Sequence, residues 1–111
     1  MSNLELIRGT VDMLVLRALV DAPKHGYAVA QWIRATSNEE LLLEEGALYP
    51  ALHRLAERGW VMSEWGLSEN NRRAKFYSLT GEGEAQLTER RSSWERYAAA
   101  VGGVLNAESD G

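Results

Sequence analysis

Apolar residues recur at helical spacing in three segments before residue 60 and in one after residue 80, which predicts four helices. The first helix is expected over residues 4–20, because Pro23 in the following DAPKHG segment disfavours helical geometry at its neighbour. The apolar positions of this helix are Ile7, Val11, Leu14, Val15, Ala18 and Leu19. A second helix is expected over residues 27–35, with a buried stripe of Val29, Trp32 and Ile33.

The third helix is expected over residues 44–58 and ends at Gly59, since glycine commonly follows the last helical residue. Its buried face consists of Leu48, Leu52 and Leu55. Because these leucines face the first two helices, other side chains project to the opposite side. Among them, Tyr49, His53 and Arg54 place a phenol and basic groups outside the core.

Two strand-like runs follow at residues 60–65 and 74–79, both rich in aromatic or β-favouring residues. The segment GLSENNRR between them is polar, and its Asn70-Asn71 pair tolerates left-handed backbone geometry. We therefore expect a hairpin. Thr80 fits the N-cap of a last helix that runs to about residue 105.

Three helices, a hairpin and a final helix predict a mainly α, α+β protein with the winged helix-turn-helix architecture. We expect residues 1–80 to form the winged-helix domain and residues 81–105 to form a long C-terminal helix. Residues 106–111 are expected to be a disordered tail.

The last helix carries an apolar stripe in which Leu87, Trp94 and Val101 repeat every seven residues. A helix of this length cannot bury its stripe on one small core, whereas pairing with a symmetry-related copy buries it. We therefore expect a homodimer. The residues expected at its interface are Leu87, Trp94, Tyr97, Ala98, Val101 and Leu105.

The composition restricts the function classes. The chain has 111 residues, of which 45% are hydrophobic and 25% charged, and this is typical of one compact domain. It contains no cysteine, which excludes disulfides and thiol nucleophiles. It also lacks a signal-peptide pattern and an apolar run of roughly 18 residues, so we expect a cytoplasmic protein. No nucleophile–base pair, phosphate loop or metal-ligand set is recognisable, so we expect no enzyme activity, cofactor or metal.

The net charge of −4 is unevenly distributed. Residues 46–75 hold 5 Lys/Arg against 3 Asp/Glu, whereas acidic residues are in excess on both sides of this segment. A polyanion responds to the local patch of charge on a protein surface. This segment contains the third helix and most of the hairpin, which is the wing of a winged helix. The DNA contacts expected from the residues are Tyr49, His53 and Arg54 on the helix and Arg72, Arg73 and Lys75 on the wing.

Four blocks resemble, in order and spacing, the signature blocks of the PadR family of transcriptional regulators: RGTVDMLVLRALV, HGYAVAQWI, EGALYPALHRLAERGWV and RRAKFYSLTGEGEAQL. The resemblance covers about residues 6–90 and implies winged-helix homodimers, usually repressors, whose C-terminal helix forms much of the dimer interface. It places Tyr27 and Pro50 in family motifs, and both join the candidate DNA contacts. At Glu44 and Ala47 family members often carry serine and threonine, so two candidate phosphate ligands are absent here.

The single C-terminal helix resembles the compact subgroup of this family, some of whose members bind flat apolar compounds in a pore at the dimer interface. The resemblance makes Trp94 a candidate effector-binding residue, and interface packing is its alternative role. The expected partners are thus double-stranded DNA, a second copy of the chain and a small apolar effector.

The leading hypothesis for the function is a sequence-specific DNA-binding regulator, a homodimeric repressor that acts on a palindromic operator and is released by an effector. The alternative is a winged-helix module for protein–protein contact without specific DNA binding, which the net charge of −4 favours. In that alternative, the acidic segments at the two ends of the chain form the working surface.

Overall fold

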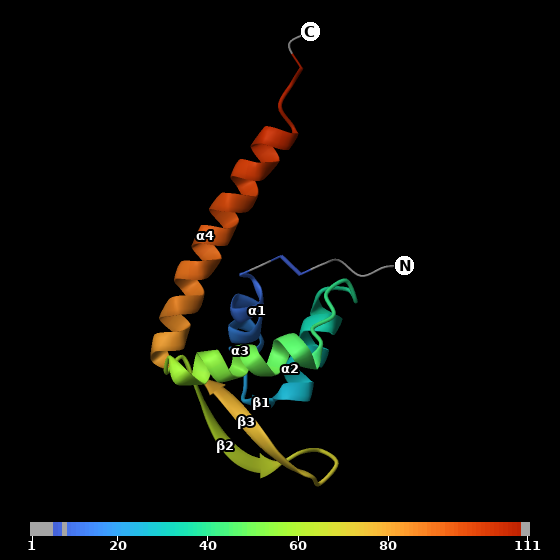
Figure 1. Ribbon diagram of the computed structural model, residues 1–111, viewed down its shortest axis with the longest axis vertical. Helices are drawn as coiled ribbons and strands as arrows, with labels where there is room; N and C mark the ends of the chain where they lie inside the picture. The colour runs from blue at the N-terminus through green and yellow to red at the C-terminus, as the bar shows by residue number, and fades with distance from the viewer. Residues whose placement is uncertain (1–5, 8, 110–111) are drawn as a thin grey trace.

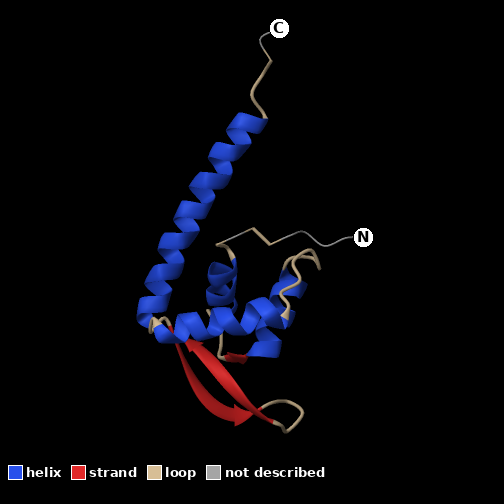
Figure 2. Ribbon diagram, viewed as in Figure 1, coloured by secondary structure: helices blue, strands red, loops and turns tan. Residues whose placement is uncertain are grey.

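The computed structural model describes residues 6–7 and 9–109 and confirms the predicted α+β winged-helix fold (Figures 1 and 2). Within these residues, a three-stranded antiparallel sheet and four helices follow one another along the chain. The elements are α1 (Val11–Ala18), β1 (Lys24–His25), α2 (Gly26–Thr36), α3 (Glu45–Glu57), β2 (Val61–Leu67), β3 (Arg73–Leu79) and α4 (Gly81–Leu105).

The first helix is shorter than predicted. It begins at Val11, because Gly9 has a φ of 92° and Thr10 closes a turn onto the carbonyl of Ile7. The side chain of Ile7 is 57% exposed and does not belong to the buried stripe. Residues 4, 5 and 8 of the predicted helix, and residues 110–111 of the predicted tail, lie outside the described residues.

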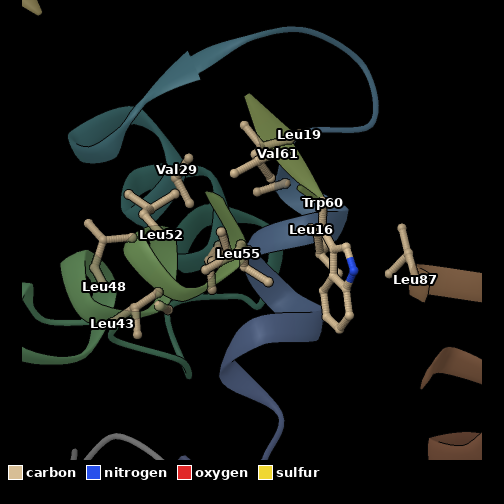
Figure 3. Packing of buried hydrophobic residues seen from close by; sticks show 14 residues of the cluster. Leu16, Leu19, Val29, Leu43, Leu48, Leu52, Leu55, Trp60, Val61 and Leu87 are labelled. Atoms are coloured by element: carbon tan, nitrogen blue, oxygen red, sulfur yellow. The ribbon is translucent and has the colours of Figure 1, made fainter. Parts of the chain in front are cut away.

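The hydrophobic core lies where α1, α2 and α3 meet the base of the hairpin (Figure 3). Leu48, Leu52 and Leu55 of α3 are each at most 2% exposed, as their spacing predicts. Each buried leucine contributes about 1.5–3 kcal/mol relative to an exposed position. These contacts fix the orientation of α3 and so determine which of its side chains face solvent.

The sheet has the strand order β1-β3-β2. The two-residue strand β1, which was not predicted, pairs Lys24 with Tyr77 and His25 with Phe76. In the hairpin, Trp65 lies opposite Lys75. Because side chains alternate between the two faces of a strand, directly paired residues share a face. One face of the wing therefore carries the cross-strand pairs Ser63–Tyr77, Trp65–Lys75 and Leu67–Arg73.

Helix α4 starts against the domain and then projects away from it (Figure 1). Thr80 is its N-cap, as predicted: its hydroxyl accepts a hydrogen bond from the Gly83 amide at 3.0 Å and donates one to the Gly59 carbonyl at 2.7 Å. Gly83 packs against the backbone of Trp60, where a side chain would collide with the Trp60 carbonyl.

Leu87 requires a correction, because it lies in the core of its own chain rather than on a free stripe. It is 8% exposed and packs in the cluster that includes Leu16 and Trp60 (Figure 3). Its burial therefore needs no partner. Further along α4, by contrast, Tyr97 is 62% exposed and Leu105 is 77% exposed.

Candidate nucleic-acid interface

The outer face of α3 carries the predicted aromatic residue in an accessible position. Tyr49 is 47% exposed, and its ring lies over the backbone of Gly26 at the start of α2. A Cβ at Gly26 would come within 2.8 Å of the ring, so the glycine leaves the space that Tyr49 occupies. Pro50 and His53 are also exposed, and the Nε2 of His53 lies 3.2 Å from the Glu57 carboxylate.

A hollow of about 600 Å³ separates α3 from the wing and the start of α2. It brings together five of the eight predicted DNA contacts, which come from three different elements: Tyr27, Tyr49, Arg72, Arg73 and Lys75. The hollow is open to solvent and also includes Glu69, an acidic residue at the tip of the wing. Pro50, His53 and Arg54 lie outside its lining.

The basic residues of the wing, Arg72, Arg73 and Lys75, are called the wing cluster below. Within the described part of the chain, none of the three has a carboxylate within 4.0 Å. Arg73 and Lys75 instead lie over the ring of Trp65, with distances to the ring centroid of 4.7 Å and 5.9 Å. Their positive charges are therefore not compensated by an ion pair and are available to an anionic partner.

Arg54 and Arg58, called the helix cluster below, occupy a different environment. The Nη2 of Arg54 donates a hydrogen bond to Oδ1 of Asp12 at 2.7 Å, and Nη1 of Arg58 lies 3.6 Å from Oδ2. The side chain of Asp12 is only 12% exposed. This carboxylate ties α1 to α3, so Arg54, predicted as a free DNA contact, already has a partner within the fold. Its role toward DNA stays a prediction.

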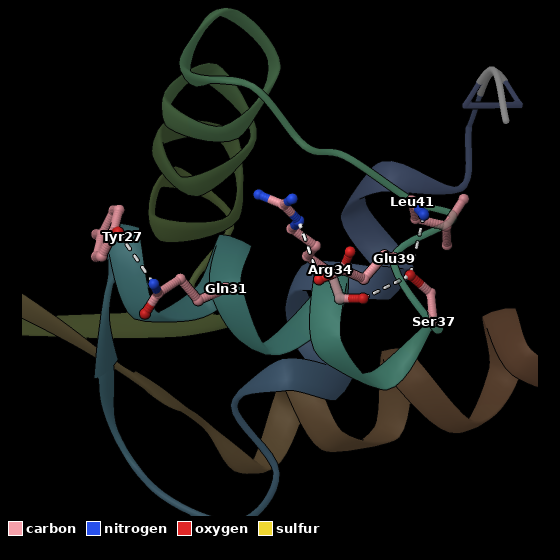
Figure 4. Close-up of polar contacts among 6 residues, drawn as sticks. All are labelled: Tyr27, Gln31, Arg34, Ser37, Glu39 and Leu41. Atoms are coloured by element: carbon pink, nitrogen blue, oxygen red, sulfur yellow. Dashed lines mark hydrogen bonds and ion pairs between the residues drawn. The ribbon is translucent and has the colours of Figure 1, made fainter. Parts of the chain in front are cut away.

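The tyrosine hydroxyls of the hollow differ in their surroundings. Burial raises the pKa of Tyr77, and the neighbouring Tyr49 raises it further, so the Tyr77 hydroxyl keeps its proton and can donate a hydrogen bond. The Tyr27 hydroxyl accepts a hydrogen bond from Nε2 of Gln31 at 2.9 Å (Figure 4). Tyr27 is 65% exposed, so its hydroxyl can also donate a hydrogen bond to a partner.

The turn between α2 and α3 sets the position at which α3 begins. Asn38 and Glu39 have φ values of 60° and 65°, which reverse the chain direction after α2. The Ser37 hydroxyl accepts a hydrogen bond from the Leu41 amide at 2.9 Å, and Arg34 lies 3.8 Å from Glu39 (Figure 4). These local contacts stabilise the turn between α2 and α3, and the turn determines where α3 begins.

Two residues of this region were missed by the sequence reasoning. Asp12 was not expected to contact α3, because a pairing across 42 positions leaves no local signal. Trp65 was not among the predicted contacts, yet it is 58% exposed and lines the hollow beside the wing cluster. Its two-residue alternation with Ser63 and Leu67 was the available signal, since it places all three on the face shared with Lys75.

A second, smaller hollow of about 400 Å³ lies between the segment before α1 and the middle of α4. Its lining includes Ile7, Met13, Trp94 and Tyr97. The rings of Trp94 and Tyr97 are 6.4 Å apart. Trp94, the candidate effector-binding residue, therefore lines a hollow within a single chain, and its role toward an effector stays a prediction.

No group of three or more His, Cys, Asp or Glu side chains within residues 6–7 and 9–109 is arranged to hold a metal ion. None of the helices in the described part of the chain is long and apolar enough to cross a membrane.

The order of helices and strands and the accessible face of α3 beside the wing define a winged-helix protein. Residues 15–89 match the model of the transcriptional regulator PadR-like family, and the chain belongs to this family. The resemblance seen in the sequence is thereby confirmed, and the chain is a transcriptional regulator of the PadR-like family.

Relatives of known name agree with this assignment. The chain is 32% identical to the transcriptional regulator Rv3488 of Mycobacterium tuberculosis over 108 residues, which cover 96% of this chain and 97% of the relative. A transcriptional regulator from Clostridium thermocellum has a similar structure, with a TM-score of 0.78 and 30% identity over 86% of this chain and 93% of the other. A PadR family regulator from Eggerthella lenta gives a TM-score of 0.75 and 33% identity over 91% of this chain and 86% of the other.

Proposed function

We propose that the protein regulates transcription by binding double-stranded DNA through α3 and the wing. The observation that carries this proposal is the wing cluster: three cations without carboxylate partners among the described residues line one hollow with the exposed Tyr27 and Tyr49. Lysine and arginine side chains that neutralise phosphates supply the sequence-independent part of DNA affinity. In this proposal, Tyr49 and His53 on the outer face of α3 approach base edges in the major groove.

We propose a homodimer as the active form, because exposed apolar side chains continue along α4 beyond its contact with the domain. Tyr97, Val101 and Leu105 are 62%, 38% and 77% exposed, and Trp94 is partly buried beside them. Ala98 is exposed on the same helix. Pairing two α4 helices removes this surface from water, and the two α3 helices then read half-sites roughly 34 Å apart in a palindromic operator. Sedimentation at micromolar concentration should give about twice the chain mass of 12.4 kDa.

The direct test of DNA binding is titration of the full chain with the duplex upstream of its own gene, in steps from low to physiological salt. Each phosphate that a cation neutralises contributes about 0.9 to the slope of log affinity against log salt. We expect a steep decline in affinity and a lower affinity for mixed-sequence DNA of equal length. If affinity is weak and does not respond to salt, DNA binding is excluded and the protein-contact module takes its place.

We propose repression as the regulatory effect, because a dimer bound across a promoter blocks access of the polymerase. A reporter gene placed behind the upstream duplex tests this. Expression should fall when the protein is supplied and return when the wing cluster is replaced by glutamine. Increased expression on supplying the protein would identify an activator.

A small apolar effector is proposed for the hollow beside Trp94. The observation in its favour is the aromatic pair of Trp94 and Tyr97 next to Met13 in a space of about 400 Å³. Flat apolar compounds should quench tryptophan emission in the wild type, and Trp94→Ala should remove this quenching while Trp65→Phe retains it. Quenching that persists in Trp94→Ala would place the compound elsewhere.

A further inference from the structure

The exposed indole of Trp65 has no function in the proposal above, although it lies at the centre of the wing surface. The residue is in β2, directly opposite Lys75 of β3, and is 58% exposed. The Arg73 Cζ and the Lys75 Nζ lie over its ring, 4.7 Å and 5.9 Å from the ring centroid. The wing therefore presents an exposed aromatic side chain together with two cations, on the side that faces the hollow.

Burial does not explain this position. The other hairpin aromatics are more enclosed: Phe76 on the opposite face packs at the edge of the His25 ring, and Tyr77 is partly buried. Trp65 lies further toward the tip, beyond the reach of the core cluster. Most of the indole therefore stays accessible to a partner, beside two cations that have no carboxylate within 4.0 Å among the described residues.

We propose that Trp65 is a nucleic-acid contact residue of the wing, whose indole packs against a deoxyribose while Arg73 and Lys75 reach the phosphates on either side of it. This inference rests on the proposed DNA-binding function and adds a specific contact to it. A DNA strand alternates an apolar sugar with charged phosphates, and the wing combines an exposed apolar ring with two cations close to it. Basic wings of this fold contact the backbone or the minor groove, where sugars are accessible.

A purely positioning role is the competing explanation, in which Trp65 only supports the two cations. The two roles predict different salt behaviour. If the indole contacts DNA itself, Trp65→Leu lowers affinity but leaves the salt slope unchanged, because all three charges of the wing cluster still meet phosphates. If the indole only positions the cations, the slope falls by about 0.9 for each phosphate contact that is lost.

The affinity experiment compares Trp65→Leu and Trp65→Phe with the wild type, using a 30-base-pair duplex of the upstream DNA. We expect about fivefold to tenfold weaker binding for the leucine variant, the lower part of the range for an aromatic ring stacked on nucleic acid, and a smaller loss for phenylalanine. Both variants should unfold at nearly the wild-type temperature, since the side chain is largely exposed.

A spectroscopic experiment provides a readout that a supporting role would not change. Acrylamide quenching of tryptophan emission is measured with and without the duplex. DNA should protect an emission component in the wild type that is missing in Trp65→Phe. The matched control is Trp32→Phe, because Trp32 also lies near two cations, Arg17 at 5.4 Å and Lys24 at 5.7 Å, but does not line the hollow.

Wild-type affinity in Trp65→Leu, or DNA protection that persists in Trp65→Phe, would overturn the proposal while DNA binding itself stands. A reduced salt slope in Trp65→Leu would overturn it in favour of positioning. A wild-type protein that fails to bind the duplex at low salt would overturn the proposed function and the Trp65 contact together.

Discussion

The helix cluster and the wing cluster consist of similar side chains, but their surroundings differ. Arg54 and Arg58 share a carboxylate, Asp12, whose side chain is 12% exposed. The wing cluster lies on the hairpin beside an aromatic ring and, within the described residues, has no carboxylate partner. Positive charge alone therefore does not identify a DNA contact. Among the described residues, the helix cluster is paired within the fold, whereas the wing cluster is free for the proposed DNA partner.

The largest effect is expected when the wing cluster is neutralised by Arg72→Gln, Arg73→Gln and Lys75→Gln together. Three lost phosphate contacts should lower the salt slope by about 2.7 and the affinity by about 100-fold at physiological salt. Because the residues are largely solvent-facing, the midpoint of urea unfolding should stay nearly constant. Titration of the upstream duplex measures the first effect. As a control, Arg17→Gln with Arg96→Gln removes charge elsewhere and should change affinity by less than about threefold.

The helix cluster should show the opposite behaviour, with the main effect on stability. Arg54→Ala removes the 2.7 Å hydrogen bond and leaves the largely buried Asp12 carboxylate, among the described residues, with the longer contact to Arg58. We expect a loss of about 1–2 kcal/mol in the free energy of unfolding, measured by urea denaturation at a fixed protein concentration.

The matched control for this prediction is Arg17→Ala. Arg17 is as exposed as Arg54, at 44% against 45%, but its partner Asp21 is 72% exposed and 4.0 Å away. An exposed pair of this kind contributes about 0–1 kcal/mol. Equal losses in the two variants would show that the burial of Asp12 does not distinguish the helix cluster.

Asp12→Asn tests whether the ion pairs with Asp12 keep Arg54 and Arg58 from binding DNA phosphates. Removing its charge leaves Arg54 with a neutral partner, and the Arg54 side chain is 45% exposed. We expect the salt slope to steepen by about 0.9, as one more phosphate is neutralised. An unchanged slope, with the affinity also unchanged, would place the helix cluster outside the DNA-facing surface.

The smallest effect is expected at Gly26, between the two clusters. In Gly26→Ala the added Cβ comes within 2.8 Å of the Tyr49 ring, whose free end can move aside. Stability should change by less than about 1 kcal/mol, while DNA affinity falls about fivefold because the phenol is displaced. Gly81→Ala, where no atom lies within 4 Å of the new Cβ, provides the comparison. Full affinity in Gly26→Ala would remove Tyr49 from the list of contacts.

Local sequence signals predicted the elements that have strong periodicity or clear boundaries. The leucine spacing and the stop at Gly59, with its φ of 77°, located α3 to within one residue at each end. The same approach extended the first helix too far, because the apolar spacing continues through Ile7 although Gly9 breaks the helix. A strand of two residues such as β1 has too little alternation to be recognised.

The candidate site was predictable only in part, for a physical reason. Exposure of Tyr49 follows from the positions of the buried leucines on the same helix. The pairing of Arg54 depends on a residue 42 positions earlier, and the burial of Leu87 depends on how α4 crosses α1. Such contacts arise from the tertiary arrangement, and periodicity along one segment carries no information about them.

The junction at Gly83 has a mechanical consequence. The first turn of α4 lies directly on the Trp60 backbone, and Thr80 is hydrogen-bonded on both sides of the contact, to the Trp60 carbonyl through its amide and to Gly83 through its hydroxyl. These contacts couple the orientation of α4 to that of the base of the hairpin. In a dimer joined along α4, a small change in the crossing angle of the two helices is amplified at the distant tips of the hairpins. The distance between those tips then sets which operators the pair can span.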